Sequence, residues 1–198
     1  MERVLVVPRD ALFFERYFQG FLSAEEYDYL PIIKKNKMFL DRNMAEKDPN
    51  FKQIIPYNVF ILNNKVFLMQ RTKNQTEERL HDKLSLGIGG HINEIDHEED
   101  IIELGRQREF LEEVNYYGGQ DVKLLGYIND DHVDVGKVHF GLVFLIKGDN
   151  DKIEVREKDK MTGRLLSLSE VRDKFALLEE WSKIVFKQID GPVYQPGR

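Results

Sequence analysis

The fold is decided by two neighbouring stretches of sequence, Leu-Gly-Ile-Gly-Gly-His at residues 86–91 and Gly-Arg-Gln-Arg-Glu-Phe-Leu-Glu-Glu-Val at residues 105–114. The first is a short β-rich run that ends in a double glycine. The second has helical spacing, because at about 100° per residue Glu109, Glu112 and Glu113 share one side of a helix. Apolar residues fall together on the opposite side: Leu104, Phe110, Leu111 and Val114. We therefore expect a strand, a loop and a helix in this order.

The three glutamates of this helix face indicate a divalent cation. Carboxylates on one face repel one another and raise one another's pKa unless a cation lies among them. Hard oxygen ligands of this kind suit Mg²⁺, with Mn²⁺ as the alternative. The chain has no cysteine, so only oxygen and histidine ligands can serve a metal. Taken alone, the same pattern is also typical of an acidic helix face that only contacts water.

In this setting the sequence resembles the Nudix hydrolase family. The signature of that family runs Gly, five residues, Glu, seven residues, and then Arg-Glu-apolar-x-Glu-Glu-x-Gly-apolar. Residues 108–113, Arg-Glu-Phe-Leu-Glu-Glu, match its second half in full, and residues 89–92, Gly-Gly-His-Ile, resemble its usual opening. The order of the expected strands around the motif fits a Nudix domain over most of the chain.

Some positions depart from that signature. Counting back eight residues from the arginine of the motif gives Asp100 and not glutamate. Gly90 lies ten residues before Asp100 where the signature has six, so the intervening loop is longer. Glu98 or Glu99 could therefore take the place of Asp100. The glycine that should follow the last glutamate pair is replaced by Asn115, which can still adopt a left-handed helix end.

The resemblance implies hydrolysis of a compound in which a nucleoside diphosphate is linked to another group, or of a nucleoside triphosphate. Cleaving such a phosphoanhydride requires neutralised charge on the non-bridging oxygens, an in-line water and a stabilised leaving phosphate. By resemblance, Glu109, Glu112 and Glu113 are the Mg²⁺ ligands, and the carbonyl of Gly90 adds another. Arg108 would orient the glutamates through charge-assisted hydrogen bonds and would not clamp the substrate.

More than one residue is a candidate for the general base and for the contacts to substrate phosphates. The base is either a helix glutamate or a distant acidic residue, for which Glu157 is the candidate; an acidic loop that only contacts water is the alternative. Arg71 and Arg79 flank the loop before the motif and are candidates for binding substrate phosphates, with a plain surface role as the alternative for Arg79. His91 and His139 receive no ligand role, because a histidine in a strand or loop usually makes a structural contact.

Two other functions fit parts of the pattern. A non-catalytic module that senses nucleotides on a Nudix scaffold usually loses a helix glutamate or adds a DNA-binding domain. All three glutamates remain here, and the net charge is −6. Isomerisation of an isoprenoid diphosphate typically requires a cysteine, which the chain lacks. A hydrolase is therefore the first expectation and the sensing module the alternative.

Composition limits the partners. The 198 residues are 41% hydrophobic and 32% charged, which predicts one large globular domain or one domain with an extension. No stretch approaches about 18 uninterrupted apolar residues, so we expect no membrane partner. With 29 basic against 35 acidic residues, nucleic acid is a poor partner as well. We expect a small nucleotide-type diphosphate as the partner, and a cytoplasmic location because no secretory signal begins the sequence.

The expected fold class is α+β, a Nudix-type α/β/α sandwich with a mixed β-sheet and an N-terminal extension packed on it. Residues 1–50 would form the extension, and residues 51–198 the Nudix hydrolase domain. The extension is rich in aromatic residues that would be costly to leave in water. It therefore either covers the substrate cleft or forms the interface of a homodimer.

Strands are expected at residues 4–7, 54–62, 65–70, 84–88, 122–128, 138–146 and 163–168. The pair Asn63-Asn64 suits a hairpin turn, and Pro56 would make its strand an edge strand or one that starts late.

Helices are expected from Asp10 to Phe18 and from Ser23 to Leu30 in the extension. A long helix near the C-terminus would begin at the capping box formed by Ser167 and Glu170.

Overall fold

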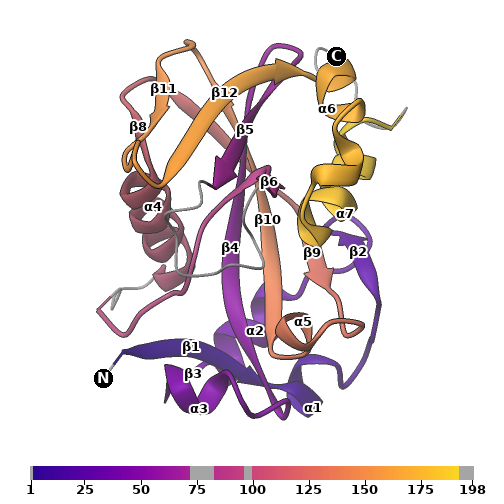
Figure 1. The fold of residues 1–198 in the computed structure, drawn as a ribbon. Helices are drawn as coiled ribbons and strands as arrows, with labels where there is room; N and C mark the ends of the chain where they lie inside the picture. The colour runs from indigo at the N-terminus through magenta and orange to yellow at the C-terminus, as the bar shows by residue number, and fades with distance from the viewer. Residues whose placement is uncertain (1, 72–82, 96–99, 192–198) are drawn as a thin grey trace. The chain divides into compact units, whose positions relative to one another are not determined.

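The computed structural model describes residues 2–71, 83–95 and 100–191 (Figure 1). The chain forms two compact units, which we call unit 1 and unit 2. Unit 1 comprises residues 1–57, 89–109 and 124–144. Unit 2 comprises residues 58–88, 110–123 and 145–198. The domain boundary expected at residue 50 stays a prediction.

The strands of the described chain are β1 (Arg3–Pro8), β2 (Gly20–Ser23), β3 (Met38–Asp41), β4 (Phe51–Leu62), β5 (Lys65–Arg71), β6 (Leu84–Ser85), β7 (Gly87–Ile88), β8 (Val114–Tyr116), β9 (Gln120–Asn129), β10 (His139–Gly148), β11 (Ile153–Val155) and β12 (Met161–Ser167). The helices are α1 (Arg9–Leu12), α2 (Leu30–Asn36), α3 (Arg42–Ala45), α4 (Ile101–Glu113), α5 (Asp134–Lys137), α6 (Leu168–Arg172), the 3₁₀ helix η2 (Phe175–Leu177) and α7 (Glu180–Ile189). The main sheet follows the order β12-β5-β4-β10-β9-β2. This mixed sheet with its helices confirms the expected α+β class.

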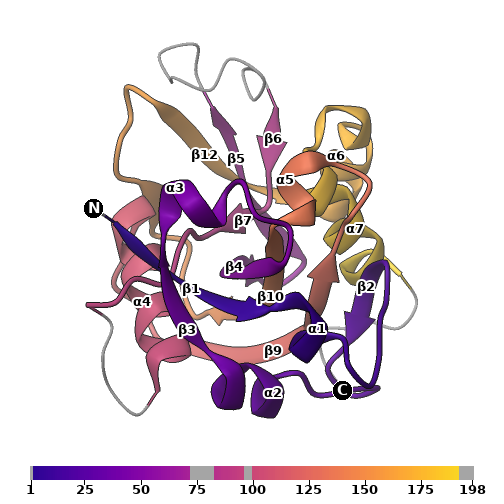
Figure 2. The same ribbon diagram turned by 90° about the horizontal axis from the view of Figure 1, so that it is seen from below.

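The N-terminal segment belongs to the sheet of unit 1. Strand β1 pairs antiparallel with β3 and with the start of β4, where Val6 lies opposite Gln53; Figure 2 shows β1 and β3 side by side. Strand β2 pairs antiparallel with β9, where Phe21 lies opposite Ile128. Opposed residues of paired strands share one face of the sheet. The pairings of β1 with β4 and of β2 with β9 therefore join the first 50 residues to strands that follow later in the sequence.

Aromatic rings of the N-terminal segment build the core of unit 1. Phe13, Phe18 and Tyr29 pack edge to face on Phe140 of β10, with ring centroids 5.9, 5.9 and 5.3 Å from it. Tyr29 also packs on Tyr127 of β9 at 5.1 Å. Such pairs contribute about 0.5–1.5 kcal/mol each beyond their buried area. The expectation that the aromatic segment packs onto the following strands is confirmed.

Unit 2 has its own core. Strand β5 pairs antiparallel with β12 along its length and forms the expected hairpin with β4. Asn63 in that turn has a φ of 53°, the left-handed conformation that a tight hairpin needs. The buried apolar residues of the cluster are Phe60, Phe67, Met69, Ile88, Phe110, Val114, Tyr116, Ile146, Ile153, Val155 and Met161. The last turn of α4 is anchored in this core through Phe110.

The first expected helix is shorter than its pattern suggested. Helix α1 ends at Leu12 and not at Phe18, and its N-cap residue is Pro8 and not Asp10. The physical reason is tertiary: Phe13 turns into the aromatic core, where its ring lies 6.4 Å from that of Phe18. Ring packing therefore overrides the local helical spacing.

The second expected helix is displaced along the chain. Ser23 ends strand β2, and α2 begins only at Leu30, where the predicted helix should have ended. Pro31 lies in the first turn of α2. Proline has no backbone N–H, but the N–H groups of the first turn have no partner within the helix, so nothing is lost there. Its fixed φ also suits a helix start. Pro31 therefore begins a helix and does not end one.

Two further expectations about the elements need correction. Strand β4 runs through Pro56 and lies between β5 and β10, so it is neither an edge strand nor a late-starting one. Pro56 falls between the residues paired with β1 and those paired with β7. The capping box of Ser167 and Glu170 is confirmed, but its helix stops at Arg172 and the rest of the segment forms η2 and α7.

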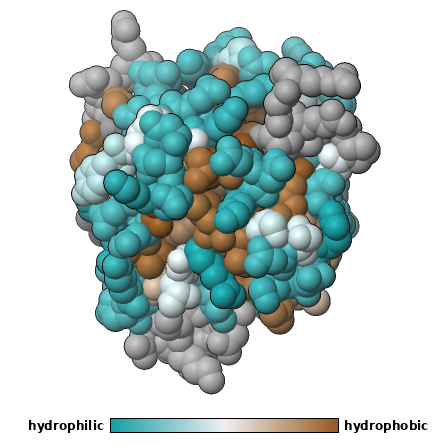
Figure 3. Space-filling model, turned by 90° about the horizontal axis from the view of Figure 1, so that it is seen from above, coloured by the Kyte–Doolittle hydropathy of each residue, from teal (hydrophilic) through white to brown (hydrophobic). Residues whose placement is uncertain are grey.

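Hydrophilic residues make up most of the coloured surface in Figure 3, and apolar residues show between them near its centre. Within the described part of the chain, no helix is long and apolar enough to cross a membrane.

Candidate functional site

The three motif glutamates lie on one continuous helix. Helix α4 spans Ile101–Glu113, so Glu109, Glu112 and Glu113 share one side of it, as their spacing predicts. The side chain of Glu109 is only 12% exposed, whereas Glu112 is open to solvent. Other buried residues of α4 share the side of Glu109: Ile102, Gly105 and Arg106. Leu111, on the apolar side of the sequence pattern, is 46% exposed. The Glu109 side is therefore buried from Ile102 to Arg106, whereas in the last turn Phe110 of the apolar side is buried and Glu112 is exposed.

The double glycine after β7 is required by two close approaches within unit 1. A Cβ at Gly89 would collide with the backbone carbonyl of Pro56. A Cβ at Gly90 would lie 2.8 Å from the carboxyl carbon of Glu109. Close-packed interiors leave no room for such an overlap, so neither position admits a side chain without a shift. Gly90 thus leaves the space that the Glu109 carboxylate occupies, and the two halves of the motif meet here.

Arg108 connects the same loop to the same glutamate. Its Nη1 donates to Oε1 of Glu109 over 2.7 Å, and its Nη2 donates to the carbonyl oxygen of His91 over 2.8 Å. Hydrogen bonds from a charged guanidinium are about twice as strong as neutral ones. The fork of the guanidinium therefore fixes the Glu109 carboxylate relative to the glycine loop.

Two histidines meet beside this loop. His139, the first residue of β10, has Nδ1 2.6 Å from the carbonyl oxygen of Val135 and Nε2 3.4 Å from Nε2 of His91. Burial lowers the pKa of His91 to about 3, with smaller contributions from the positive charge of Arg42 and from His139. Burial also lowers the pKa of His139, more than the hydrogen bond to Val135 raises it. No role was expected for this pair, and no local spacing indicates a contact between residues 48 positions apart.

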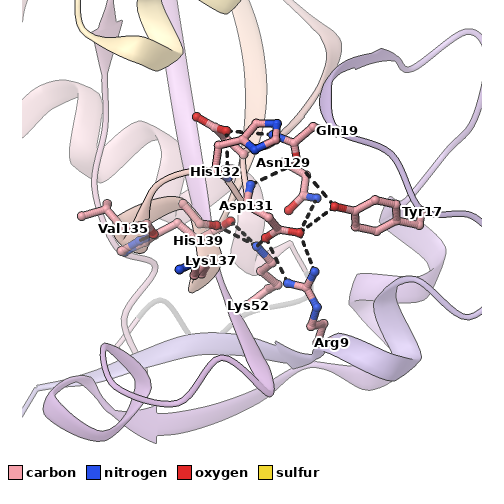
Figure 4. A network of polar contacts seen from close by, with 12 residues as sticks. Arg9, Tyr17, Gln19, Lys52, Asn129, Asp131, His132, Val135, Lys137 and His139 are labelled. Atoms are coloured by element: carbon pink, nitrogen blue, oxygen red, sulfur yellow. Dashed lines mark hydrogen bonds and ion pairs between the residues drawn. The ribbon is translucent and has the colours of Figure 1, made fainter.

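A polar network centred on Asp131 lies between the N-terminal segment and the connection from β9 to β10 (Figure 4). Asp131 accepts hydrogen bonds from Arg9 at 2.5 Å, Lys52 at 2.8 Å and the hydroxyl of Tyr17 at 2.8 Å. Burial would raise the pKa of Asp131, but these three donors outweigh it and hold that pKa well below its usual range. The fully buried Lys52 also donates to the carbonyl oxygen of His139 over 3.3 Å. The network thus reaches the histidine pair.

The loop that carries Glu157 lies beside the end of α4 within unit 2. The backbone N–H of Arg156 donates to the carbonyl oxygen of Glu113 over 2.9 Å. The side chain of Glu157 is 55% exposed and forms an ion pair with Lys160 at 2.8 Å. The structure therefore brings this candidate close to the end of the motif helix and leaves its carboxylate in contact with solvent.

Several sequence candidates are described only in part. Arg79, Glu98 and Glu99 lie outside the described residues, and so does the side chain of Arg71. The backbone of Arg71 ends β5, opposite Met161.

The two remaining motif positions are described. Asp100 is exposed in the turn before α4, and its carbonyl oxygen accepts the backbone N–H of Leu104. Asn115 lies inside β8, paired opposite Glu154, and does not form a left-handed helix end. The chain passes directly from α4 into this strand, so the glycine of the signature has no turn to make here.

The donors near Glu109 fit a hard divalent cation. They are carboxylate and carbonyl oxygens, and Gly90 keeps the space beside the Glu109 carboxylate free of a side chain. Across residues 2–71, 83–95 and 100–191, no three His, Asp or Glu side chains, those of Glu109, Glu112 and Glu113 included, are grouped so that they alone could hold a metal ion. Mg²⁺ does not require one, because it usually keeps several waters and binds through one or two carboxylates plus substrate phosphates.

A cavity of about 690 Å³ opens in unit 1. Its lining comes from the N-terminal segment and the start of β4 and includes Phe13, Tyr17, Met38 and Phe51. None of the predicted site residues is part of this lining. An interface between two copies of the chain through this segment stays a prediction.

A comparison with known sequences finds one extended likeness to a curated protein. No protein-family model matches the chain. Protein YmaB of Bacillus subtilis (strain 168) is 38% identical over 196 residues, which covers 93% of this chain and 95% of that protein. The likeness therefore includes most of the N-terminal segment.

Solved structures with a similar fold are found as well. Tm1382, described as "a putative Nudix hydrolase", superposes with a TM-score of 0.81 at 32% identity, covering 95% of this chain and 98% of that one. DR0079 of Deinococcus radiodurans gives a TM-score of 0.56 at 13% identity, over 76% and 90% of the chains. The Nudix domain of NrtR from Shewanella oneidensis, crystallised with ADP ribose, gives 0.51 at 14%, over 76% and 97%. The last two likenesses show the fold alone.

Proposed function

The chain belongs to the Nudix hydrolase family, and we propose that it is a Mg²⁺-dependent enzyme that hydrolyses a phosphoanhydride bond in a nucleotide. The substrate class is a nucleoside diphosphate linked to another group, or a nucleoside triphosphate. One observation carries the proposal: Arg108 and Gly90 together position the half-buried carboxylate of Glu109 on the helix that also carries Glu112 and Glu113.

The metal would be held by oxygen atoms of the motif. We assign its ligands to Glu109, Glu112, Glu113 and the carbonyl oxygen of Gly90, with Mn²⁺ as the alternative ion. When bound, the ion supplies charge neutralisation on the phosphate oxygens and lowers the pKa of a water. Arg108 keeps Glu109 in one orientation, so that this ligand does not have to be ordered again at each turnover.

The general base is either a glutamate of α4 or Glu157. A base must reach the proton of the attacking water directly or through one further water. Glu157 is supported by the hydrogen bond that ties its loop to Glu113 and by its solvent-accessible carboxylate. Arg71 and Arg79 are assigned to the substrate phosphates, because a guanidinium matches the geometry of phosphate oxygens.

A substrate panel with metal titration tests the proposal. The panel contains ADP ribose, which the NrtR domain binds, together with nucleotide sugars, dinucleoside polyphosphates and nucleoside triphosphates. The wild type is compared with Glu112→Gln and Glu113→Gln, and with Glu154→Gln as a matched control. Glu154 is also an exposed glutamate of unit 2 and forms an ion pair with Lys158.

We expect Mg²⁺-dependent turnover of at least one compound by the wild type and by Glu154→Gln. Each α4 variant should lose at least about 100-fold in kcat/KM, as expected when a group that acts only in the transition state is removed. Nucleotide binding without turnover would favour the sensing module instead. Equal behaviour of the wild type and both α4 variants on every compound would refute the proposal.

A further inference from the structure

The histidine pair joins two parts of unit 1 that are distant in sequence. His139 begins β10 and follows α5, whereas His91 follows directly on the double glycine. The Nε2 atoms of the two rings are 3.4 Å apart, and the ring centroids are 5.5 Å apart. A side-chain contact of this kind fixes the loop of His91 relative to the sheet strand of His139.

The chemistry of the neighbours defines which nitrogen carries each proton. A carbonyl oxygen only accepts, so Nδ1 of His139, 2.6 Å from the carbonyl oxygen of Val135, must carry a proton. In a neutral imidazole the other nitrogen is then an acceptor. Nε2 of His139 therefore accepts, and Nε2–H of His91 donates. The contact has a direction, and only one tautomer of each ring satisfies it.

The backbone of His91 continues the connection to the motif. Its carbonyl oxygen accepts from Nη2 of Arg108 at 2.8 Å, and Nη1 of the same guanidinium donates to Glu109 at 2.7 Å. A shift of the His91 loop therefore moves the acceptor that orients Arg108. It also moves Gly90, whose missing side chain makes room for the Glu109 carboxylate.

The other side of His139 is anchored as well. Lys52 is fully buried, and its ammonium group donates to the carbonyl oxygens of His139 and Gly136 at 3.3 and 2.7 Å. Asp131 compensates this charge, and its two carboxylate oxygens accept hydrogen bonds from Nη1 and Nη2 of Arg9. The start of β10 is thus held from the N-terminal segment, as Figure 4 shows.

We propose that His139 is a positioning residue for the hydrolytic reaction: through His91 it holds the glycine loop and Arg108 in the arrangement that orients Glu109. The N-terminal segment supports His139 through Asp131 and Lys52. This inference rests on the proposed function and deepens it, because it gives the first 50 residues a part in the same site. His139 itself contacts neither the substrate nor the metal in this role.

The first test separates positioning from binding and from folding. His139→Leu removes the acceptor for His91, and His139→Gln restores an acceptor at nearly the same place. His132→Leu is the matched control, because His132 lies on the same connection and its side chain is exposed. Folding of each variant is followed by urea denaturation.

We expect His139→Leu to lower kcat at least about tenfold, since small displacements of catalytic groups cost that much or more, with KM within about twofold of the wild type. His139→Gln should recover kcat to within about threefold, and His132→Leu should match the wild type. An unchanged kcat in a folded His139→Leu would overturn the inference, and so would a loss that appears in KM alone.

The second test needs neither a variant that folds nor an active enzyme. Long-range ¹H–¹⁵N spectra of the wild type at neutral pH report which ring nitrogen carries the proton. We expect a proton on Nδ1 but not on Nε2 of His139, and a proton on Nε2 of His91. A proton on Nε2 of His139, or two imidazolium rings, would overturn the inference. If the wild type cleaves no compound of the panel, the proposed function fails, and the spectra alone decide whether the histidine contact exists.

Discussion

The motif glutamates in the C-terminal half of helix α4 differ in how firmly they are held. Glu109 is 12% exposed, accepts from Arg108 and fills the space left by Gly90. Glu112 is open to solvent, and Glu113 lies next to it at the last position of the helix. The Glu109 carboxylate is thus nearly enclosed, whereas Glu112 is exposed and Glu113 is half-buried.

This difference suggests a division of labour. A fixed carboxylate costs folding energy but needs no ordering during catalysis, because its place is set in advance. Exposed carboxylates cost little to fold and suit a metal that arrives together with its substrate phosphates. We expect changes at Glu109 to alter both stability and activity, and changes at Glu112 to alter activity alone.

The largest effect should come from Asp131, whose network with Lys52 and His139 supports the loop next to Glu109. Asp131→Asn leaves the buried ammonium group of Lys52 without its compensating charge. Removing one partner of a buried ion pair typically costs 3–5 kcal/mol, so we expect a loss of about 3 kcal/mol in the free energy of unfolding. Asp134→Asn is the control, because Asp134 is 96% exposed and pairs with Lys137 on the surface. Urea denaturation at pH 7 measures both, and equal stabilities would contradict the account.

The same variant predicts a pH dependence. The pKa of Asp131 lies below its usual range in the folded protein, whereas the unfolded value is about 3.9. Its contribution is therefore fully present above about pH 4 and is lost as the pH falls toward the folded pKa. The stability difference between the wild type and Asp131→Asn should shrink between pH 7 and pH 3. A difference that stays constant would show that the charge of Asp131 is not the cause.

Substitutions of Glu109 and Glu112 compare the two kinds of carboxylate directly. Glu109→Gln and Glu112→Gln should each lower kcat/KM at least about 100-fold, which corresponds to about 2.7 kcal/mol. Glu109→Gln should also destabilise the protein by about 1–2 kcal/mol, because Arg108 loses its charged partner. Glu112→Gln should leave the unfolding free energy within about 0.5 kcal/mol. Equal stability losses for the two variants would remove the distinction.

A substitution of Glu157, in the loop beside the end of α4, tests which group is the base. If Glu157 is the base, Glu157→Gln should lower kcat about 100-fold and remove the lower pKa from the pH–rate profile. Glu154→Gln changes a glutamate of β11 that is 64% exposed and should leave both unchanged. A Glu157→Gln enzyme with the wild-type profile would assign the base to a glutamate of α4.

The smallest effect concerns the glycine that faces Glu109. Gly90→Ala should destabilise by about 1–2 kcal/mol, because the new Cβ overlaps the Glu109 carboxylate. In a Glu109→Ala background the same substitution should cost less, since the overlapping group is gone. Gly89→Ala meets the backbone of Pro56 and should show no such rescue. Additive costs for Gly90→Ala and Glu109→Ala would contradict the packing described for this pair.

Features fixed by local spacing were predictable from the sequence. The Arg-Glu-Phe-Leu-Glu-Glu run predicts a helix with three carboxylates on one side, and α4 has that arrangement. Asn63 predicts a hairpin turn because it tolerates a positive φ, and Ser167 with Glu170 predicts a capped helix start. Each of these depends on residues within a few positions of one another.

Features set by contacts between distant residues were not predictable. The close approach of Gly90 to the Glu109 carboxylate and the hydrogen bond from Arg108 to the carbonyl oxygen of His91 are contacts that helical spacing does not indicate. The end of α1 at Leu12 follows from rings that pack on Phe140. The contact of His91 with His139 joins two elements that no spacing rule relates.

The rate of nucleotide hydrolysis as a function of Mg²⁺ concentration, for the wild type and Glu112→Gln side by side, tests the central claim most directly. The claim is that the glutamates of α4 serve a divalent ion in phosphoanhydride cleavage. We predict a wild-type rate that rises with Mg²⁺ to saturation, and a Glu112→Gln rate at least about 100-fold lower at every concentration. Identical curves for the two proteins, or turnover that does not depend on Mg²⁺, would contradict the claim.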